Sequence, residues 1–109
     1  MDDLMIQMGA RILERRKQMR LTQEELAERA GITPQTVSAA ELGKKALRPE
    51  NIVRISTVLD VSTDYLLLGK VTKTDYAFLS DQVDLLEPNQ YRHLEDIVKS
   101  YMAAILEKD

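Results

Sequence analysis

The sequence of 109 residues contains no cysteine and few aromatic residues, prolines or glycines. Without cysteine there is no disulfide framework, no thiolate metal site and no cysteine nucleophile, and a reducing compartment is the expected environment. The aromatic residues are four tyrosines and one phenylalanine, so any core must be built from aliphatic side chains. Since 44% of the residues are hydrophobic, the composition predicts a folded protein.

Long hydrophobic runs are also missing. No segment approaches the ~20 consecutive apolar residues that cross a membrane. Asp2, Asp3, Gln7 and Arg11 interrupt the first 20 residues, which therefore lack the apolar stretch of an export signal. We expect a soluble cytoplasmic protein with no membrane partner.

The net charge of −3 is distributed unevenly along the chain. Residues 1–70 contain 11 Lys or Arg and 10 Asp or Glu, a net charge of +1, whereas residues 71–109 contain 4 and 8, a net charge of −4. Within the first part, basic residues form two clusters: Arg11, Arg15, Arg16, Lys17 and Arg20, and then Lys44, Lys45, Arg48 and Arg54. Phosphate binding needs local positive charge and tolerates distant negative charge. The clusters favour a nucleic-acid partner, and solvated surface is the alternative for any single residue.

Hydrophobic residues recur at helical spacing almost throughout, and no segment alternates as a half-buried strand does. The pattern predicts an all-α fold. The helices expected in the first part span about residues 3–19, 23–30 and 34–41, then Pro49 to Leu59, and a short helix from Ser62 to Leu67. Gly69 is expected to close this first domain.

Two of these helices are joined by a short turn. Thr22 and Glu25 have the spacing of a capping box at the start of 23–30, and Gly31 follows its last turn, where a left-handed conformation is preferred. Thr33 can cap the next helix, and Pro34 suits its first turn because proline has no amide hydrogen to lose. Two helices crossing at roughly 90–120° over such a turn form a helix-turn-helix, whose second helix enters the DNA major groove. A small helical bundle is the alternative.

Several segments resemble the Cro and lambda-repressor family of helix-turn-helix regulators in order and spacing. These segments are LTQEELA at 21–27, AGI at 30–32, VS at 37–38, ELGK at 41–44, residues 52–59, and VSTDYLLLG at 61–69. The resemblance covers about residues 8–69 and implies a five-helix, lambda-repressor-like DNA-binding domain in residues 1–69. It further implies a transcriptional repressor that binds a palindromic operator in double-stranded DNA as a homodimer, through recognition helix 34–41.

The resemblance also implies which residues contact bases. Gln35, in the first turn of the recognition helix, would be the main reader, because a glutamine amide can form two hydrogen bonds with adenine. Ser38 and Ala39 share its exposed face and are expected to contact base edges or a thymine methyl group. Pro34 stands at an early recognition position without an amide hydrogen or a flexible side chain. We therefore expect modest specificity, or specificity that depends partly on DNA shape.

Phosphate contacts are implied on either side of the recognition helix. Gln23, at the start of the preceding helix, is expected to meet a phosphate through its amide group and the helix N-terminus. Thr36 is expected to face the DNA backbone. Lys44, Lys45 and Arg48 would bind phosphates beyond the recognition helix, which fixes register without reading sequence.

Arg16 and Glu41 are implied as structural residues. They align with a buried ion pair that joins the first helix to the end of the recognition helix in members of this family. Ala40 departs from the family, which usually has a larger apolar residue at that position. The core beneath the recognition helix must then be filled in another way.

The last third of the chain is expected to be a separate helical extension. Residues 70–79 show no clear periodicity and are predicted to be a linker, followed by an association segment in residues 80–109. Ser80 is expected to cap a short helix, and Pro88 to begin a second helix that reaches about Glu107.

One face of this last helix is apolar, since residues recur at spacings of three and four: Tyr91, Leu94, Val98, Tyr101 and Ile105. We call these five residues the seam. Because dyad-related half-sites require a dimer, we expect the seam to mediate self-association. Packing on the first domain is the alternative. A further hypothesis is that residues 80–109 bind a protein antagonist, or that the chain is an antitoxin that holds a toxin.

Little in the sequence favours catalysis. His93 is the only histidine, and no other His or Cys completes a metal site. Acidic pairs such as Asp81 with Asp84 and Glu95 with Asp96 are typical of solvated helix faces, and the scattered glycines form no phosphate-binding loop. We expect a protein that is not an enzyme and has no cofactor. A helical adaptor that never binds DNA is a third hypothesis.

Overall fold

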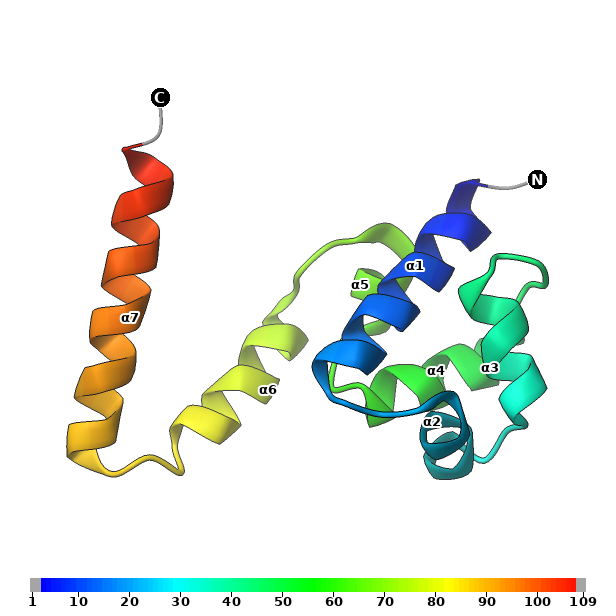
Figure 1. Ribbon diagram of the computed structural model, residues 1–109, viewed down its shortest axis with the longest axis horizontal. Coiled ribbons are helices and arrows are strands. Elements are labelled where there is room, and N and C mark those ends of the chain that lie inside the picture. The colour runs from blue at the N-terminus through cyan, green and yellow to red at the C-terminus, as the bar shows by residue number, and fades with distance from the viewer. Residues whose placement is uncertain (1–2, 108–109) are drawn as a thin grey trace. The chain divides into compact units, whose positions relative to one another are not determined.

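The computed structural model describes residues 3–107, and all regular structure within them is helical (Figure 1). The helices are α1 Asp3–Gln18, α2 Gln23–Ala30, α3 Pro34–Glu41, α4 Pro49–Val58, α5 Thr63–Leu68, α6 Lys73–Val83 and α7 Pro88–Leu106. The chain divides into two compact units, of which the first extends to Phe78 and the second begins at Leu79. The predicted all-α fold is confirmed, and α1–α5 begin and end within one or two residues of their predicted bounds.

Local capping sets the ends of α2 and the start of α3. The Thr22 hydroxyl accepts a hydrogen bond from the amide of Glu25 at 3.0 Å, and the Glu25 carboxylate accepts one from the amide of Thr22 at 2.8 Å. Gly31 then adopts a left-handed conformation with φ 73° and ends α2. Thr33 caps α3 by accepting from the amide of Thr36 at 3.1 Å. The two ends of α2 and the start of α3 are therefore specified by residues next to them in the sequence.

The core of the first unit is aliphatic, as the scarcity of aromatic residues predicts. Its buried side chains are Met8, Ile12, Leu21, Leu26, Ala27, Ala30, Val37, Ala40, Ile55, Leu59 and Leu66. These residues come from α1 to α5, from the segment before α2 and, in the case of Leu59, from the position that follows α4, so all five helices share one core. Burial of this set is the main stabilising contribution to the unit.

The small residue Ala40 is accommodated by the close approach of α1 to α3. A side chain at Gly9 of α1 would collide with the carbonyl oxygens of Ala40 and Glu41, the latter lying 2.8 Å from the position of its Cβ atom. Gly9 and Ala40 are both buried. The backbones of α1 and α3 therefore lie in direct contact beside Ala40, and a side chain at position 9 would push them apart.

A buried ion pair ties α1 to the end of α3. Arg16 Nε donates to Glu41 Oε2 at 2.6 Å and Arg16 Nη2 to Glu41 Oε1 at 3.0 Å, while the two side chains are only 11% and 3% exposed. Arg16 Nη1 donates to the Leu21 carbonyl at 2.8 Å. The hydrogen bond from Arg16 to Glu41 raises the pKa of Arg16, and so the guanidinium remains charged. These bonds join α1, the segment before α2 and α3.

The prediction for residues 70–79 was wrong, because α6 begins at Lys73 and Ser80 lies inside it. The first unit likewise continues to Phe78, beyond the boundary expected at Gly69. Thr72 and Asp75 have capping-box spacing, and the amide of Thr72 donates to Asp75 Oδ2 at 2.8 Å. This signal was present in the sequence, but the weak amphipathic pattern of 73–83 concealed the helix.

The second unit consists of the rest of α6 and α7, which begins at the expected Pro88. No residue of α7 is buried. Four residues of the seam, Tyr91, Val98, Tyr101 and Ile105, are exposed, and Leu94 is half-buried. Within this unit, the apolar face of α7 is therefore largely exposed.

Glu41→Ala should destabilise the first unit, because it leaves the charged Arg16 buried without its carboxylate. Removing one partner of a buried ion pair typically costs about 3–5 kcal/mol of unfolding free energy. Chemical denaturation followed by circular dichroism measures this change. Glu28→Ala, on the exposed side of α2, is the control and should change the free energy by less than about 0.5 kcal/mol. Loss of ligand binding with unchanged stability would contradict the structural role of Glu41.

Candidate nucleic-acid interface

Helix α3 is packed on α2 through one side and leaves the other side open. Val37 and Ala40 are buried, whereas Pro34 and Gln35 are exposed. Ser38 and Ala39, the other expected base-contacting residues, are half-buried. Their partial exposure leaves them a smaller accessible surface than Gln35 has. The exposed side therefore offers one long polar side chain, Gln35, next to small groups.

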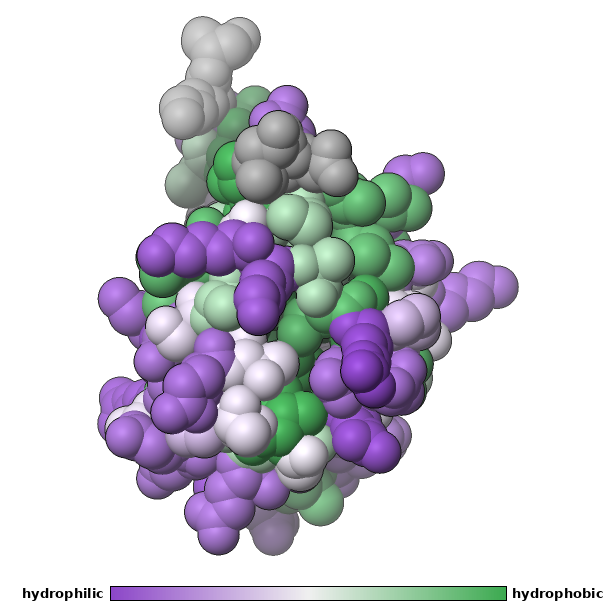
Figure 2. Space-filling view, turned by 90° about the vertical axis from the view of Figure 1, so that its right-hand side faces the viewer, coloured by the Kyte–Doolittle hydropathy of each residue, from purple (hydrophilic) through white to green (hydrophobic). Residues whose placement is uncertain are grey.

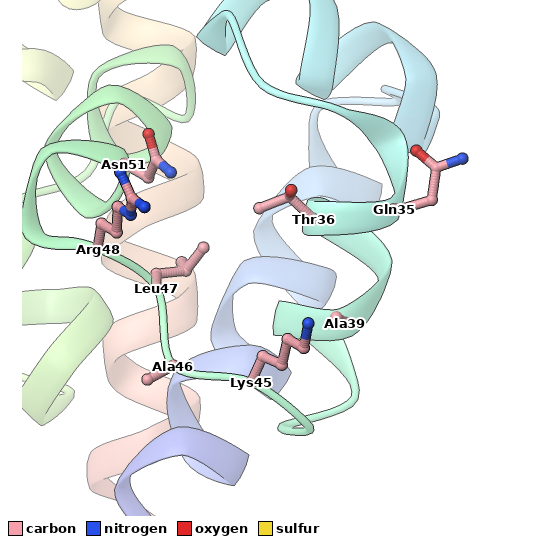
Figure 3. A pocket seen from close by; sticks show the side chains of 8 residues that line it. All are labelled: Gln35, Thr36, Ala39, Lys45, Ala46, Leu47, Arg48 and Asn51. Carbon is pink, nitrogen blue, oxygen red and sulfur yellow. The ribbon is translucent and has the colours of Figure 1, made fainter.

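A groove of about 400 Å³ runs along this side of α3 (Figure 3). Its walls are α3, the segment after α3 and the start of α4, and it is lined by Gln35, Thr36, Ala39, Lys45, Ala46, Leu47, Arg48 and Asn51. Thr36 points across the groove toward the α4 side, whereas the amide of Gln35 points away from the domain. Five residues expected at a DNA interface thus come together here: Gln35, Thr36, Ala39, Lys45 and Arg48. Pro34, Ser38, Gln23 and Lys44 do not line the groove.

Asn51 is a candidate that the sequence reasoning missed. It lies in the first turn of α4, half-buried, and it lines both this groove and a neighbouring hollow that includes Thr36, Arg48 and Arg54. An asparagine amide can donate to a phosphate or to a base edge. In the sequence, only its position three residues after the basic Arg48 and two after Pro49 could have indicated that Asn51 lies at the interface.

The second basic cluster, which follows α3, has no ion-pair partners among residues 3–107. The salt bridges in this part of the chain involve Arg16 with Glu41, Arg92 with Glu95 and Lys99 with Glu95. Lys44, Lys45, Arg48 and Arg54 are exposed. Their positive charges are therefore available to an external anion such as phosphate.

In the first basic cluster, by contrast, most of the side chains form hydrogen bonds within the folded unit. Arg11 Nη1 donates to the Leu66 carbonyl in the last turns of α5 at 3.0 Å, and Arg15 Nε donates to the Leu59 carbonyl that follows α4 at 2.8 Å. Such carbonyls at helix C-termini have no hydrogen-bond partner within the helix, and the arginine side chain donates to them. Its positive charge also interacts favourably with the negative end of the helix dipole. With Arg16 held by Glu41, three of the five residues are committed to internal contacts. Only the cluster after α3 remains a strong candidate for phosphate binding.

Gln23 also makes an internal contact. Its Nε2 donates to Glu41 Oε1 at 2.9 Å, so the side chain expected at a phosphate is oriented by the ion pair. The Thr36 hydroxyl is paired with the Thr33 hydroxyl at 2.8 Å. Each group keeps further hydrogen-bonding capacity, because an amide nitrogen has a second hydrogen and a hydroxyl oxygen two lone pairs.

The molecular surface on the right-hand side of Figure 1 is mixed in character. Figure 2 shows apolar side chains in the middle of this face with hydrophilic side chains on both sides of them. Such a surface can combine van der Waals contacts at its centre with polar contacts at its rim.

A family model described as helix-turn-helix matches residues 12–66, which include α2, the turn and α3. The chain belongs to the helix-turn-helix family. The match covers α2, α3 and α4 in full, together with the last seven residues of α1 and most of α5, and it includes Arg16 and Glu41 as well as the lining of the groove.

Known helix-turn-helix proteins resemble this one over different lengths. The HTH-type transcriptional regulator YqaE of Bacillus subtilis is 46% identical over 55 residues, which are 50% of this chain and 47% of that protein. Repressor protein C2 of Salmonella phage P22 is 34% identical over 73 residues, 67% of this chain and 34% of the repressor. The chain thus spans half or less of the length of these curated relatives.

Two solved structures have similar folds. The P22 c2 repressor in complex with a synthetic operator superimposes with a TM-score of 0.57 and 35% identity, over 58% of this chain and 96% of that chain. A complex of the SinR and SinI proteins gives a TM-score of 0.56 with 25% identity, over 88% of this chain and 98% of that chain. The second likeness extends beyond the helix-turn-helix unit into α6 and α7.

Residues 3–107 contain no group of three or more His, Cys, Asp or Glu side chains that could hold a metal ion. None of the helices in this range is both long and apolar enough to span a membrane.

Arg15→Ala and Lys45→Ala should separate the roles of the two basic clusters. Arg15→Ala leaves the Leu59 carbonyl unpaired and should lower the unfolding free energy by about 1.5–3 kcal/mol, as expected for a hydrogen bond to a charged group. Lys45→Ala should change it by less than about 0.5 kcal/mol, because Lys45 makes no such contact. Thermal and chemical denaturation measure both. Equal effects of the two substitutions would contradict the division.

Proposed function

We propose that this chain is a sequence-specific DNA-binding transcriptional regulator that inserts α3 into the major groove of its operator. The observation that carries the proposal is the groove in which α3 lies beside unpaired basic residues, with Gln35 exposed at its edge. The match to the P22 c2 repressor, solved in complex with a synthetic operator, supports it. The names of the curated relatives support a role in transcription regulation.

Base recognition is assigned mainly to Gln35. Its amide carries a donor and an acceptor, and it stands in the first turn of α3, the end that enters the groove in helix-turn-helix proteins. Ala39 lies one turn further on, and its methyl group can pack against the methyl group of a thymine. Ser38 can donate to a base edge, and Pro34 can add only van der Waals contact.

Phosphate binding is assigned to the residues that flank α3. Lys44, Lys45 and Arg48 follow it and are exposed, so they can reach the strand on one side of the groove. The start of α2 can meet a phosphate through its free amides and through Gln23, which the Arg16–Glu41 pair orients. Asn51 completes the wall on the α4 side, and Thr36 of α3 points toward it. This arrangement explains how a chain of net charge −3 can bind DNA.

We further propose that the chain binds a palindromic operator as a homodimer, joined through the seam of α7, and that it acts as a repressor. A dimer presents two copies of α3 to two half-sites about one helical turn apart. The exposed seam supports self-association, because an apolar face of this length is unfavourable in water. A repressor among the relatives supports repression, for which occupation of a promoter is sufficient.

A protein partner for the same seam is the second candidate. The likeness to a chain of a complex of SinR and SinI covers 88% of this chain, part of α7 included, and that structure contains a second protein. An antagonist or a toxin that covers the seam would compete with self-association. Both hypotheses place a partner on the same residues. The mass of the purified protein in solution distinguishes them, because only self-association doubles it.

The first expected result concerns DNA binding. The protein should bind duplex DNA from its own promoter region roughly 10³-fold more tightly than random duplex, and affinity should fall steeply as salt rises. Gln35→Ala should cost about 1–3 kcal/mol on the specific duplex only. Lys45→Ala should weaken binding to both duplexes and reduce the slope of log K against log salt by about 1. Fluorescence anisotropy with competitor DNA measures all three.

Gln82→Ala, an exposed glutamine of α6, is the matched control for Gln35→Ala and should bind as the unaltered protein does. Equal affinity for both duplexes at every salt concentration would contradict sequence-specific recognition. An unchanged preference in Gln35→Ala would contradict the role of that residue while leaving the regulator proposal intact.

The second expected result concerns self-association. The protein should have twice the 12.4 kDa chain mass in light scattering, and Tyr101→Glu should make it a monomer, because a carboxylate in an apolar interface has no partner. Ala103→Glu places the same charge on the opposite side of α7 and should leave the dimer intact. A monomeric unaltered protein would contradict the homodimer and favour a foreign partner for the seam.

A further inference from the structure

A second hollow adjoins the groove of α3 within the first unit. It has a volume of about 380 Å³ and is formed by the turn between α2 and α3, the start of α3 and the first two turns of α4. Thr36, Arg48 and Asn51 line both the hollow and the groove. The two depressions are therefore continuous, and a DNA strand that lies along one of them can continue over the other.

Arg54 is the charged residue that distinguishes the hollow from the groove. It lies in the second turn of α4, is exposed, and lines the hollow but not the groove. It takes part in none of the ion pairs within residues 3–107. The side chains of α4 that donate hydrogen bonds to the protein are those of Ser56 and Thr57. The guanidinium of Arg54 thus keeps its five N–H donors for an external acceptor.

Most of the other polar groups around the hollow are also hydrogen-bond donors. Arg48 supplies a second guanidinium, Asn51 an amide, and Thr33 and Thr36 two hydroxyl groups whose oxygens lie 2.8 Å apart. Glu50 is the acidic residue in this lining. Two guanidinium groups and one carboxylate give the described lining a net charge of +1. This composition suits an anion with more than one acceptor oxygen, such as a phosphodiester of DNA.

Glu50 opposes the effect of Arg54. The two residues lie four positions apart in α4 and both are exposed, but they do not form an ion pair with each other. Both line the same hollow, so a phosphate bound there lies close to both charges. Arg54 attracts that phosphate and Glu50 repels it. Removal of the two charges should therefore change DNA affinity in opposite directions.

We propose that Arg54 binds a backbone phosphate of the operator in this hollow, separate from the phosphates assigned to Lys44 and Lys45, and that Glu50 limits the strength of this contact. The inference rests on the proposed DNA-binding function. A phosphate contact adds affinity and fixes register, but it does not change which bases Gln35 reads. The continuity of the hollow with the groove of α3 favours DNA over an acidic protein as the occupant.

The test uses the duplex from the promoter region and a set of duplexes in which one phosphate at a time is replaced by an uncharged methylphosphonate. On the unmodified duplex, Arg54→Ala should weaken binding by roughly threefold to tenfold and reduce the slope of log K against log salt by about 1. At one phosphate, the methylphosphonate should weaken binding of the unaltered protein but not of Arg54→Ala. Lys45→Ala should lose its sensitivity at a different phosphate. Fluorescence anisotropy measures these affinities.

Glu50→Gln tests the same site with the opposite sign. It should strengthen binding by roughly twofold to fivefold, the scale of one exposed charge pair. This gain should disappear on the duplex whose methylphosphonate no longer affects Arg54→Ala.

The matched controls are Arg29→Ala and Glu28→Gln, which make the same charge changes at exposed residues of α2 outside the hollow. Exposed charges that make no contact with the DNA are screened by salt. Neither control should therefore change the response to any single methylphosphonate. All four altered residues are exposed, so the melting temperatures of the variants should agree with that of the unaltered protein.

Each contrary result has one meaning. If Arg54→Ala and Arg29→Ala respond alike to every methylphosphonate, or if Arg54→Ala and Lys45→Ala lose sensitivity at the same phosphate, the inference is wrong and the proposed function stands. If the unaltered protein binds promoter and random duplexes equally at every salt concentration, the proposed function is wrong and the inference falls with it.

Discussion

The position of the recognition helix depends on the hydrogen bonds of the Glu41 carboxylate. Glu41 is the last residue of α3, and its carboxylate accepts two hydrogen bonds from Arg16 of α1 and one from Gln23 of α2. A buried charge is costly unless all its hydrogen-bonding capacity is used, so the site accepts essentially one arrangement of these three helices. The direct approach of α1 to α3 at Gly9 adds a steric constraint to the electrostatic one. Together they hold α3 with its polar side outward.

The arginines of α1 show why the number of basic residues is a poor guide to a nucleic-acid surface. Arg11, Arg15 and Arg16 point their donors at carbonyl or carboxylate oxygens within the unit, where they connect α1 to α5, α4 and α3. The basic residues after α3 have no acceptors of this kind in the described chain and stay exposed. The surface potential that attracts DNA is thus set by which charges the fold leaves unpaired.

Helix ends in this protein are specified to different degrees by neighbouring residues. For α2 and α3 the acceptors lie within three residues of the donors they satisfy, and sequence patterns predict both helices with correct bounds. For α5 the Ser62 hydroxyl accepts locally from the amide of Tyr65, but the acceptor for the amide of Ser62 itself is Asp75, which belongs to another helix. Helix α6 itself carries little amphipathic signal. The predicted linker over 70–79 was wrong for this reason. The segment gains its order partly from a contact that no local pattern reveals.

The sequence by itself determined the all-α class, the helices α1 to α5, the helix-turn-helix and the apolar seam of α7, because periodicity, capping residues and turn glycines act within a few residues of one another. Gln35, Lys45 and Arg48 could also be nominated from their places in the pattern. Only the tertiary structure decided which polar groups are used internally and which remain free. In the folded unit the arginines of α1 and the amide of Gln23 form internal hydrogen bonds, Asn51 lies at the groove, and Asp75 accepts hydrogen bonds from Ser62. Hydrogen-bond partners that are distant in sequence come together only when the helices pack.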